Sequence, residues 1–516
     1  MPENTLGGSW DISDRDLLFD TISFAPARVG ANRDGLRRVG VVDIGSNSVR
    51  LVVFDGAARS PAYFYNEKIM CGLGRDLQST GKLHPDGRER ALAAMRRFAI
   101  LAREMKFSAL TTVATAAVRE ASDGPAFAKQ VAKDTGIQMD VASGADEARL
   151  AAQGVLLGWP EADGLVSDLG GGSMEMARIK AGEIGAAAST PLGPLRLMML
   201  DEAERKKTLS KHMKALVKAM DGGAERLFLV GGAWRALATV DMARRDYALR
   251  VLHEYVMTPQ DAAATAELVR KTAPEVLSRD YGASSSRLAL LPYASEILLE
   301  MVKRVDPKQI AISSYGLREG LLFAHMPKDI RRLDPLLEAA RHTEAASARF
   351  PGFGDALFGW MGPALPKRIA ARARLVKAAC LLHDTAWRAH PDYRAQISFE
   401  NATHANLGGL AHAERVFLGL ALANRYKSSA VSAQMPGMAL LAESEAQDAA
   451  YVGRLMRLGS MVAGGSARAL GQTAVRLSGN TLELRVSKGA RDLVTEVAKK
   501  RLGAAAACLG LDATIA

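Results

Sequence analysis

The chain has 516 residues, of which 48% are hydrophobic and 24% charged, and its formal net charge is +11. This length predicts about two to four domains, and the balance of residue types is typical of a globular protein. No run of about 18 apolar residues occurs, so no membrane-spanning helix is expected. The basic surplus favours a polyanionic partner. An aromatic content of 6% argues against a protein that binds nucleic acid by stacking on its bases.

The beginning of the chain, residues 1–9, has no basic region followed by an apolar core, so no signal peptide is expected. The cysteines are odd in number and far apart in the sequence, at Cys71, Cys380 and Cys508. This pattern predicts neither a disulfide framework nor a zinc site. Together these features indicate a protein of the reducing cytoplasm.

Residues 1–36 show no clear periodicity and are interpreted as a loose arm. The first strand–turn–strand pattern follows at residues 39–55, with Asp43 before the turn and Gly45, Ser46, Asn47 and Ser48 in it. A helix is predicted over 86–106, where apolar residues recur at helical spacing. A buried strand at 109–114 then leads to Arg119 and Glu120.

A short strand at 138–142 precedes Ser143, which can cap a helix over 145–157. The first turn of that helix holds Asp146 and Glu147. Acidic residues stabilise the N-terminal end of a helix, so capping is one interpretation of this pair. In the other interpretation, Glu147 projects into a cleft.

Residues 164–179 repeat the strand–turn–strand pattern, with Asp168 followed by Gly170, Gly171, Gly172 and Ser173. Glycines permit positive φ and remove every Cβ, so backbone N–H groups can line an anion site. A carboxylate at the strand end, such as Asp168, can hold a divalent cation against phosphate oxygens. Taken singly, such a turn is also common in ordinary hairpins. Two copies, however, can face each other across a cleft and grip one phosphate.

The rest of the chain continues the alternation of strands and helices as far as a strand at 309–313, with helical residues over 258–305, which predicts a two-lobed α/β body. Beyond a linker at 327–334, residues 335–450 have helical spacing and few strand signals. This region contains His383-Asp384, which could ligate a metal together with His342 or His404, or could be structural. A hairpin at 474–486 and a helix at 489–507 close the sequence.

Three motifs carry a family resemblance: Val42–Leu51, Ser143–Leu150 and Asp168–Glu175. Supporting motifs in the same order are Gly72–Gly74, Val118–Arg119, Gly193, Gly231–Gly232 and Gly316–Gly320. Over residues 38–322 the chain resembles the exopolyphosphatase/guanosine pentaphosphate phosphatase (Ppx/GppA) family. The resemblance implies a two-lobed actin/hexokinase-like (ribonuclease H-like) core, an all-helical HD-like domain and a small α/β C-terminal unit. The expected bounds are 37–146 and 147–326 for the lobes, 327–450 for the helical domain and 451–516 for the last unit.

The resemblance also implies the site. Glu147 would be the general base that activates water, and Arg119 would neutralise charge on the transferring phosphoryl group. The turns Gly45–Ser48 and Gly170–Ser173 would hold that group. Asp168 and Glu175, with Asp43 nearby, would hold Mg2+. Hydrolysis would then need no covalent intermediate.

The expected activity is removal of terminal phosphate from inorganic polyphosphate. Guanosine pentaphosphate is the alternative substrate, because the reacting group is the same. A non-catalytic polyphosphate sensor and an actin-like kinase are further alternatives. The expected assembly is a homodimer, with no membrane or nucleic-acid partner. Chain-length preference and monovalent-ion requirement stay open.

Overall fold

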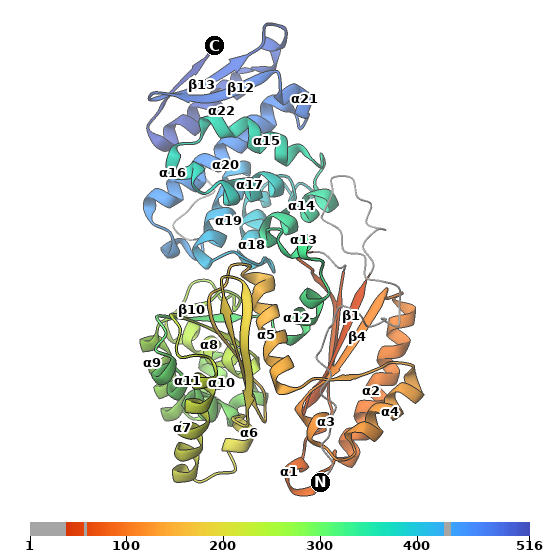
Figure 1. The fold of residues 1–516 in the computed structure, drawn as a ribbon. Helices are drawn as coiled ribbons and strands as arrows, with labels where there is room; N and C mark the ends of the chain where they lie inside the picture. Colours follow the sequence, from red (N-terminus) through yellow and green to blue (C-terminus); the bar gives the residue numbers. More distant parts are fainter. Residues whose placement is uncertain (1–37, 56–58, 428–434) are drawn as a thin grey trace. The chain divides into compact units, whose positions relative to one another are not determined.

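The computed structural model describes residues 38–55, 59–427 and 435–516 (Figure 1). The arm predicted over residues 1–36 lies outside them. The described chain divides into two compact units. Of the described residues, those within 38–245 and 255–332 form the first unit, and those within 246–254 and 333–516 form the second.

The first lobe of the first unit is a five-stranded sheet in the order β3-β2-β1-β4-β5. The central strand, β1, consists mostly of β-branched residues and is buried along most of its length. This is expected for a strand that is covered on both faces. The strands are β1 (Val39–Ile44), β2 (Ser48–Phe54), β3 (Tyr63–Met70), β4 (Ala109–Ala114) and β5 (Asp140–Val141). The helices are α1 (Leu77–Thr80), α2 (Pro85–Glu104), α3 (Ala116–Glu120) and α4 (Gly124–Thr135).

The second lobe is a six-stranded sheet in the order β10-β11-β9-β6-β7-β8. Its strands are β6 (Gly164–Leu169), β7 (Met174–Lys180), β8 (Glu183–Thr190), β9 (Arg226–Val230), β10 (Val256–Met257) and β11 (Gln309–Ser313). The helices are α5 (Gly144–Gly158), α6 (Pro194–Leu197), α7 (Glu202–Ala219), α8 (Gly232–Arg244), α9 (Pro259–Lys271), α10 (Pro274–Tyr281), α11 (Leu291–Val305), α12 (Leu317–Ala324) and α13 (Lys328–Arg331).

The two sheets share one connection pattern. β1 pairs antiparallel with β2 and parallel with β4, and β6 pairs antiparallel with β7 and parallel with β9. Helices α5 and α12 lie together between the sheets (Figure 1). A Cβ at Gly320 would lie 1.8 Å from the carbonyl oxygen of Leu150, so only glycine allows this close packing. The predicted two-lobed actin-like α/β core is confirmed.

The second unit is helical and ends in a three-stranded sheet, β12-β13-β14. Leu410 donates its N–H to Glu254 (2.7 Å), which attaches the 246–254 segment to this unit. The helices are α14 (Pro335–Ser347), α15 (Phe353–Met361), α16 (Lys367–Ala370), α17 (Ala373–Leu382), α18 (Arg394–His404), α19 (His412–Tyr426), α20 (Glu443–Ala463), α21 (Ala467–Leu470) and α22 (Glu496–Ala506). The strands are β12 (Thr473–Ser478), β13 (Thr481–Val486) and β14 (Asp512–Ile515).

Several elements differ from the sequence-based expectation. The region 258–305 is interrupted, because Pro274 starts a new helix and Gly282, with φ of 69°, ends it. The edge strands β8 and β14 have no clear alternation of apolar and polar residues and were not predicted. The three cysteines form no disulfide. Within the described ranges, every helix is too short or too polar to cross a membrane.

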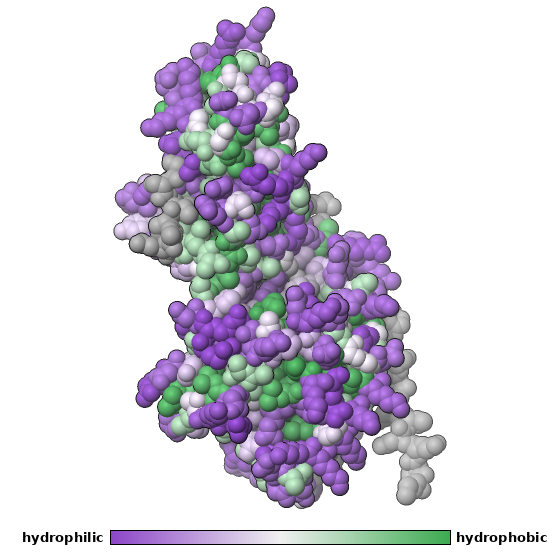
Figure 2. Space-filling view, turned by 90° about the vertical axis from the view of Figure 1, so that its left-hand side faces the viewer, coloured by the Kyte–Doolittle hydropathy of each residue, from purple (hydrophilic) through white to green (hydrophobic). Residues whose placement is uncertain are grey.

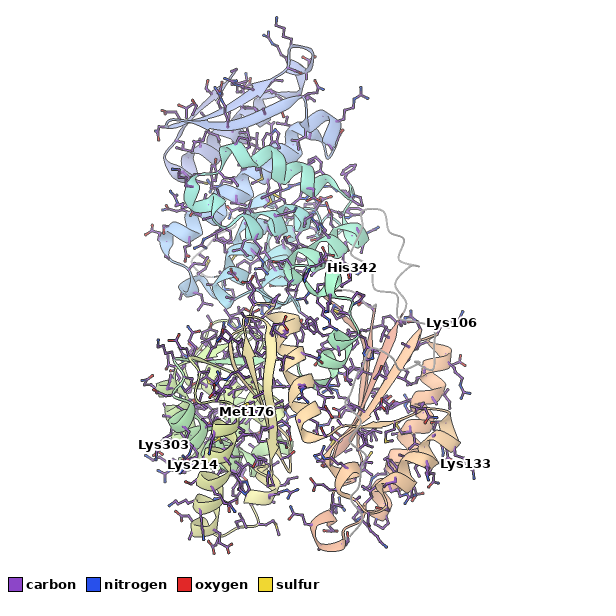
Figure 3. The ribbon with its side chains drawn as sticks, in the orientation of Figure 1. Lys106, Lys133, Met176, Lys214, Lys303 and His342 are labelled. Carbon is purple, nitrogen blue, oxygen red and sulfur yellow. The ribbon has the colours of Figure 1, made fainter. Side chains whose placement is uncertain are left out.

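Basic side chains are spread over the outer surface of the first unit. Lys106, Lys133, Lys214 and Lys303 point outward, whereas Met176 lies inside the second sheet (Figure 3). On the face in Figure 2, hydrophilic side chains predominate and apolar ones are interspersed among them. These four lysines are thus exposed to solvent.

Candidate active site

The two predicted hairpin turns have the same backbone geometry. The N–H of Gly45 donates to the carbonyl oxygen of Ser48 (3.0 Å), and the N–H of Gly170 donates to that of Ser173 (3.0 Å). The first turn is also held by the Cys71–Gly74 segment, because Gly74 donates its N–H to Ser46 (2.8 Å). Both turns line one cavity of 280 Å³ in the first unit.

The cavity holds all four carboxylates singled out in the sequence: Asp43, Glu147, Asp168 and Glu175. Asp168 and Glu175 are directly opposite each other on β6 and β7. Burial raises the pKa of Asp168 to about 7, with a further contribution from the charge of Glu147. Burial and the charge of Asp168 raise the pKa of Glu175 to about 7, and burial raises that of Asp43. Such a cluster favours a positively charged ligand or a proton.

The neighbouring residue Asp146 caps helix α5, so Glu147 is not needed for the cap. Ser143 and Asp146 form the capping box of α5, with reciprocal hydrogen bonds of 3.2 and 3.1 Å. Glu147 is buried, lines the cavity and accepts a hydrogen bond from Nη1 of Arg119. Burial and the charge of Glu175 raise the pKa of Glu147 to about 8, although Arg119 opposes the shift. The geometry therefore leaves Glu147 available to the cleft.

Arg119 reaches Glu147 from the end of α3, in the first lobe. Its Nη1 also donates to the carbonyl oxygen of Ala142 (2.6 Å), which fixes the guanidinium next to the first turn of α5. Arg119 itself is not among the residues that line the cavity. Its contact with the site in this structure is through Glu147.

Five cationic side chains line the same cavity and were not assigned a role from the sequence: Arg50, Lys68, Arg235, Arg287 and Arg318. Burial, followed by repulsion from Arg318 and Arg235, lowers the pKa of Arg50 to about 10. Burial and neighbouring arginines also lower the pKa of Lys68. Arg50, Arg235 and Arg318 lie within or next to glycine motifs, a signal that could have revealed them. Lys68 and Arg287 carry no such signal.

Cross-strand pairing accounts for part of this charge pattern. Arg50 on β2 is opposite Asp43 on one side and Lys68 on the other. Like charges directly opposite in a sheet are destabilising unless a counter-charge lies between them. A multiply charged anion would supply that counter-charge.

The donor set suits the predicted Mg2+, because Mg2+ prefers carboxylate oxygens and because burial raises the pKa values of Asp168 and Glu175 in spite of the arginines near them. In residues 38–55, 59–427 and 435–516, no group of three or more His, Cys, Asp or Glu side chains is arranged to hold a metal by itself. A cation at Asp43, Asp168 and Glu175 would therefore need water or phosphate oxygens among its ligands, as Mg2+ commonly does.

The His383-Asp384 pair of the second unit has structural partners. Arg349 binds the Asp384 carboxylate through Nε (2.9 Å) and Nη2 (2.5 Å). Nδ1 of His383 is 2.7 Å from the carbonyl oxygen of Cys380, and burial lowers the pKa of His383 to about 4. The structure thus favours the structural interpretation of this pair.

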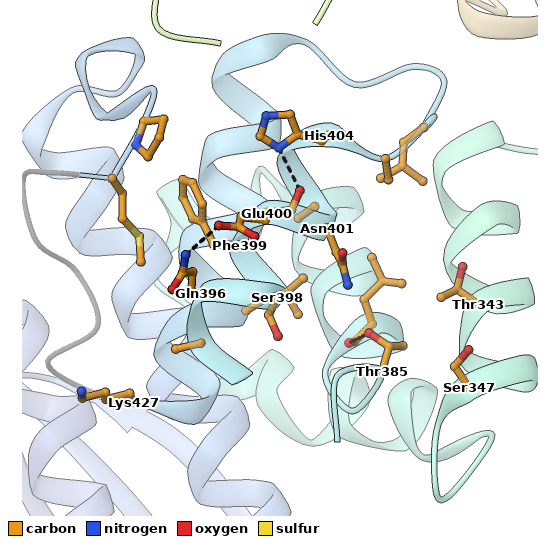
Figure 4. A pocket seen from close by; sticks show the side chains of 18 of the residues that line it. Thr343, Ser347, Thr385, Gln396, Ser398, Phe399, Glu400, Asn401, His404 and Lys427 are labelled. Atoms are coloured by element: carbon orange, nitrogen blue, oxygen red, sulfur yellow. Dashed lines mark hydrogen bonds between the residues drawn. The ribbon is translucent and has the colours of Figure 1, made fainter. Parts of the chain in front are cut away.

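The second unit also contains a cavity of 1030 Å³, lined mainly by α18 and by Thr343 and Ser347 of α14 (Figure 4). His404 lies on its wall, with Nδ1 3.1 Å from the carbonyl oxygen of Glu400. His383 and Asp384 are not among the lining residues. The cavity is therefore not built around that pair.

Two α/β lobes with paired glycine hairpins and a buried acid between them define an actin-like core. The Ppx/GppA phosphatase family profile matches residues 52–329, and the profile "Exopolyphosphatase, C-terminal" matches residues 336–515. The chain belongs to the Ppx/GppA phosphatase family and is a hydrolase.

Similar proteins agree with this assignment. Exopolyphosphatase 1 of Mycobacterium leprae (strain TN) is 28% identical over 326 residues, which cover 58% of this chain and 90% of that protein. Exopolyphosphatase 1 of Mycobacterium tuberculosis (strain ATCC 25618 / H37Rv) is 34% identical over 31% of this chain and 47% of its own length. The crystal structure of an exopolyphosphatase from Cytophaga hutchinsonii has a TM-score of 0.50 and 25% identity, covering 56% of this chain and 97% of that one.

Proposed function

We propose that the protein is an exopolyphosphatase, which removes terminal phosphate from inorganic polyphosphate. The observation that carries this proposal is the single cavity in which two glycine turns, a buried acid and five cationic side chains meet. Cations in this number suit a chain of several phosphates better than one phosphate monoester. The names of the mycobacterial relatives point to the same substrate.

In the proposed mechanism, Glu147 takes a proton from the attacking water. Backbone N–H groups of Gly45–Ser48 and Gly170–Ser173 orient the terminal phosphoryl group, and the cationic side chains stabilise charge on it and on the departing chain. Arg119 holds the Glu147 carboxylate in place. Because Arg119 does not line the cavity, its guanidinium would have to move toward the phosphoryl oxygens to neutralise their charge directly. Asp43, Asp168 and Glu175 would hold Mg2+, which would supply further charge neutralisation when bound.

The described lining of the cavity contains no aromatic side chain. Its apolar members are aliphatic: Ala116, Leu169, Leu195, Val230 and Leu317. A guanine base is usually held by stacking on an aromatic ring or an arginine. Because the described lining offers four arginines and no aromatic ring, guanosine pentaphosphate stays the alternative substrate.

The test is phosphate release by the purified protein with Mg2+, comparing long-chain polyphosphate and guanosine pentaphosphate at equal terminal-phosphate concentration. Faster release from polyphosphate is expected. Faster release from the nucleotide would replace the proposed substrate. Binding of polyphosphate without release would point to a sensor, and phosphate transfer from ATP to an acceptor would point to a kinase.

We also propose a homodimer, because two basic surfaces could together form a longer track for one polyanion. Sedimentation velocity at several protein concentrations tests this expectation. A monomer at micromolar concentration would contradict it.

A further inference from the structure

A short segment of the second lobe, Gly193–Arg196, supports the glycine turn between β6 and β7. Leu195 donates its N–H to the carbonyl oxygen of Gly171 (3.0 Å). Gly193 packs so closely on this turn that a Cβ there would lie 2.1 Å from the same oxygen. The segment and the phosphate-binding turn are therefore one packed piece of backbone.

Arg196 extends this piece across the cleft to the first lobe. Its Nη2 donates to Oε2 of Glu120 (2.8 Å), the last residue of α3. Its Nε is buried without a hydrogen-bond partner and lies 3.6 Å from where a Cβ on Gly172 would be. The guanidinium thus lies between the turn of one lobe and the helix of the other.

Glu120 is adjacent in the chain to Arg119, and both belong to a helix of five residues. Arg119 binds Glu147, whereas Glu120 binds Arg196. The two neighbours therefore attach α3 to the second lobe through two ion pairs. Helix α3 supplies the cation in one pair and the anion in the other. Because so short a helix has few other hydrogen bonds, displacement of Glu120 should also displace Arg119.

We propose that Arg196 and Glu120 form a positioning pair, which keeps Arg119 on Glu147 and couples that contact to the turn that grips phosphate. This inference rests on the proposed function, because it concerns the same site. The side chains of the pair are 29% and 40% exposed, so their attraction by itself contributes little to stability. Their effect is expected on the geometry of α3.

A double-mutant cycle tests the proposal. Arg196→Ala should lower kcat for polyphosphate about tenfold and change KM by less than about twofold, since Arg196 acts through Arg119. In an Arg119→Ala background the same change should lower kcat by less than about twofold. Additive losses would overturn the proposal. A rise in KM as the main effect would also overturn it, because Arg196 would then bind substrate.

Charge reversal provides a second test. Arg196→Glu and Glu120→Arg should each reduce kcat, and the double variant should restore it to within about threefold of the wild type. A double variant no better than either single variant would overturn the pair. The matched control is Asp134→Asn, which removes the Arg96–Asp134 ion pair (2.5 Å) of the first lobe and should leave kcat unchanged.

Hydrogen exchange of the amides at 116–121 provides a measurement independent of activity. Arg196→Ala should accelerate exchange there, and the charge-reversed double variant should return it to the wild-type rate. If the wild type releases no phosphate from polyphosphate, the proposed function fails, and exchange alone then decides. Unchanged exchange in Arg196→Ala would overturn the positioning pair whatever the activity.

Discussion

Nη1 of Arg119 donates a hydrogen bond to Oε1 of Glu147, and this contact joins α3 of the first lobe to α5 at one buried carboxylate. Burial raises the pKa of Glu147 to about 8, and Arg119 limits the increase. A carboxyl group in this range is a stronger base than an exposed glutamate and is still partly ionised near neutral pH. The contact thus links the position of the acid to its chemistry.

The pH dependence of activity should report on Glu147. The group must be ionised to accept a proton, and its pKa of about 8 means that it is mostly protonated at lower pH. If no other group titrates, kcat/KM should rise about tenfold per pH unit below pH 7, reach half its maximum near pH 8 and level off above that pH. A cation bound nearby would lower this midpoint, because it favours the ionised form. A profile that is flat from pH 5 to 9 would contradict the assignment.

Replacing Glu147 by glutamine should lower kcat by about 10²- to 10⁴-fold and leave polyphosphate binding largely intact, because the side chain keeps its size but cannot accept the proton. Phosphate release and equilibrium binding measure the two effects. The matched control is Asp146→Asn, which alters the capping box and should cost about 1 kcal/mol of stability or less while preserving kcat. Equal losses of kcat in both variants would count against the role of Glu147.

Stability without a divalent cation should fall as pH rises. The pKa values of Asp168, Glu175 and Glu147 are raised to about 7, 7 and 8, so the folded state binds more protons than the unfolded one. Their contribution is complete below the unfolded values near 4 and is lost as pH rises through 7 to 8. The melting temperature in EDTA should therefore decrease from pH 5 to 8, and millimolar Mg2+ should recover part of the loss. An Mg2+ effect as large at pH 5 as at pH 8 would contradict a site made of these carboxylates.

The cationic lining should determine affinity for the phosphate chain. Lys68→Ala should raise KM for polyphosphate by about three- to tenfold and reduce the salt dependence of binding, because one counter-charge to the chain is lost. Titrations at several salt concentrations measure the slope. Lys106→Ala, on the outer surface of the first unit, is the control (Figure 3). A similar change in both variants would indicate a general charge effect.

The His383-Asp384 pair should affect stability and not metal content. Asp384→Asn would leave Arg349 without its carboxylate partner and should destabilise the second unit by about 1–3 kcal/mol. Thermal unfolding of the full chain measures this loss. Treatment with a zinc chelator should not change the transition of the second unit. A metal that co-purifies with the wild type and is lost in Asp384→Asn would contradict the structural interpretation.

Much of the fold follows from local patterns in the sequence. The hairpins around Gly45 and Gly170 have short, largely apolar runs followed by glycine turns, and both signals depend on neighbouring residues only. The edge strands β8 and β14 could not be predicted in this way, because they are held by pairing with β7 and β13 and not by a hydrophobic face. The helical pattern over 258–305 obscures the signals at Pro274 and Gly282, which divide this region in the structure.

The sequence by itself determined the motifs, their order and the family that they define, since these depend on residue type and spacing. Only the tertiary structure decided whether Glu147 helps to cap α5 or lines the cavity, because both interpretations have the same local sequence. It also decided that Lys68 and Arg287 belong to the cavity, and that Arg196 of the second lobe meets Glu120 of the first. These relationships join residues far apart in the chain, and close approach in space follows from how the sheets and helices pack.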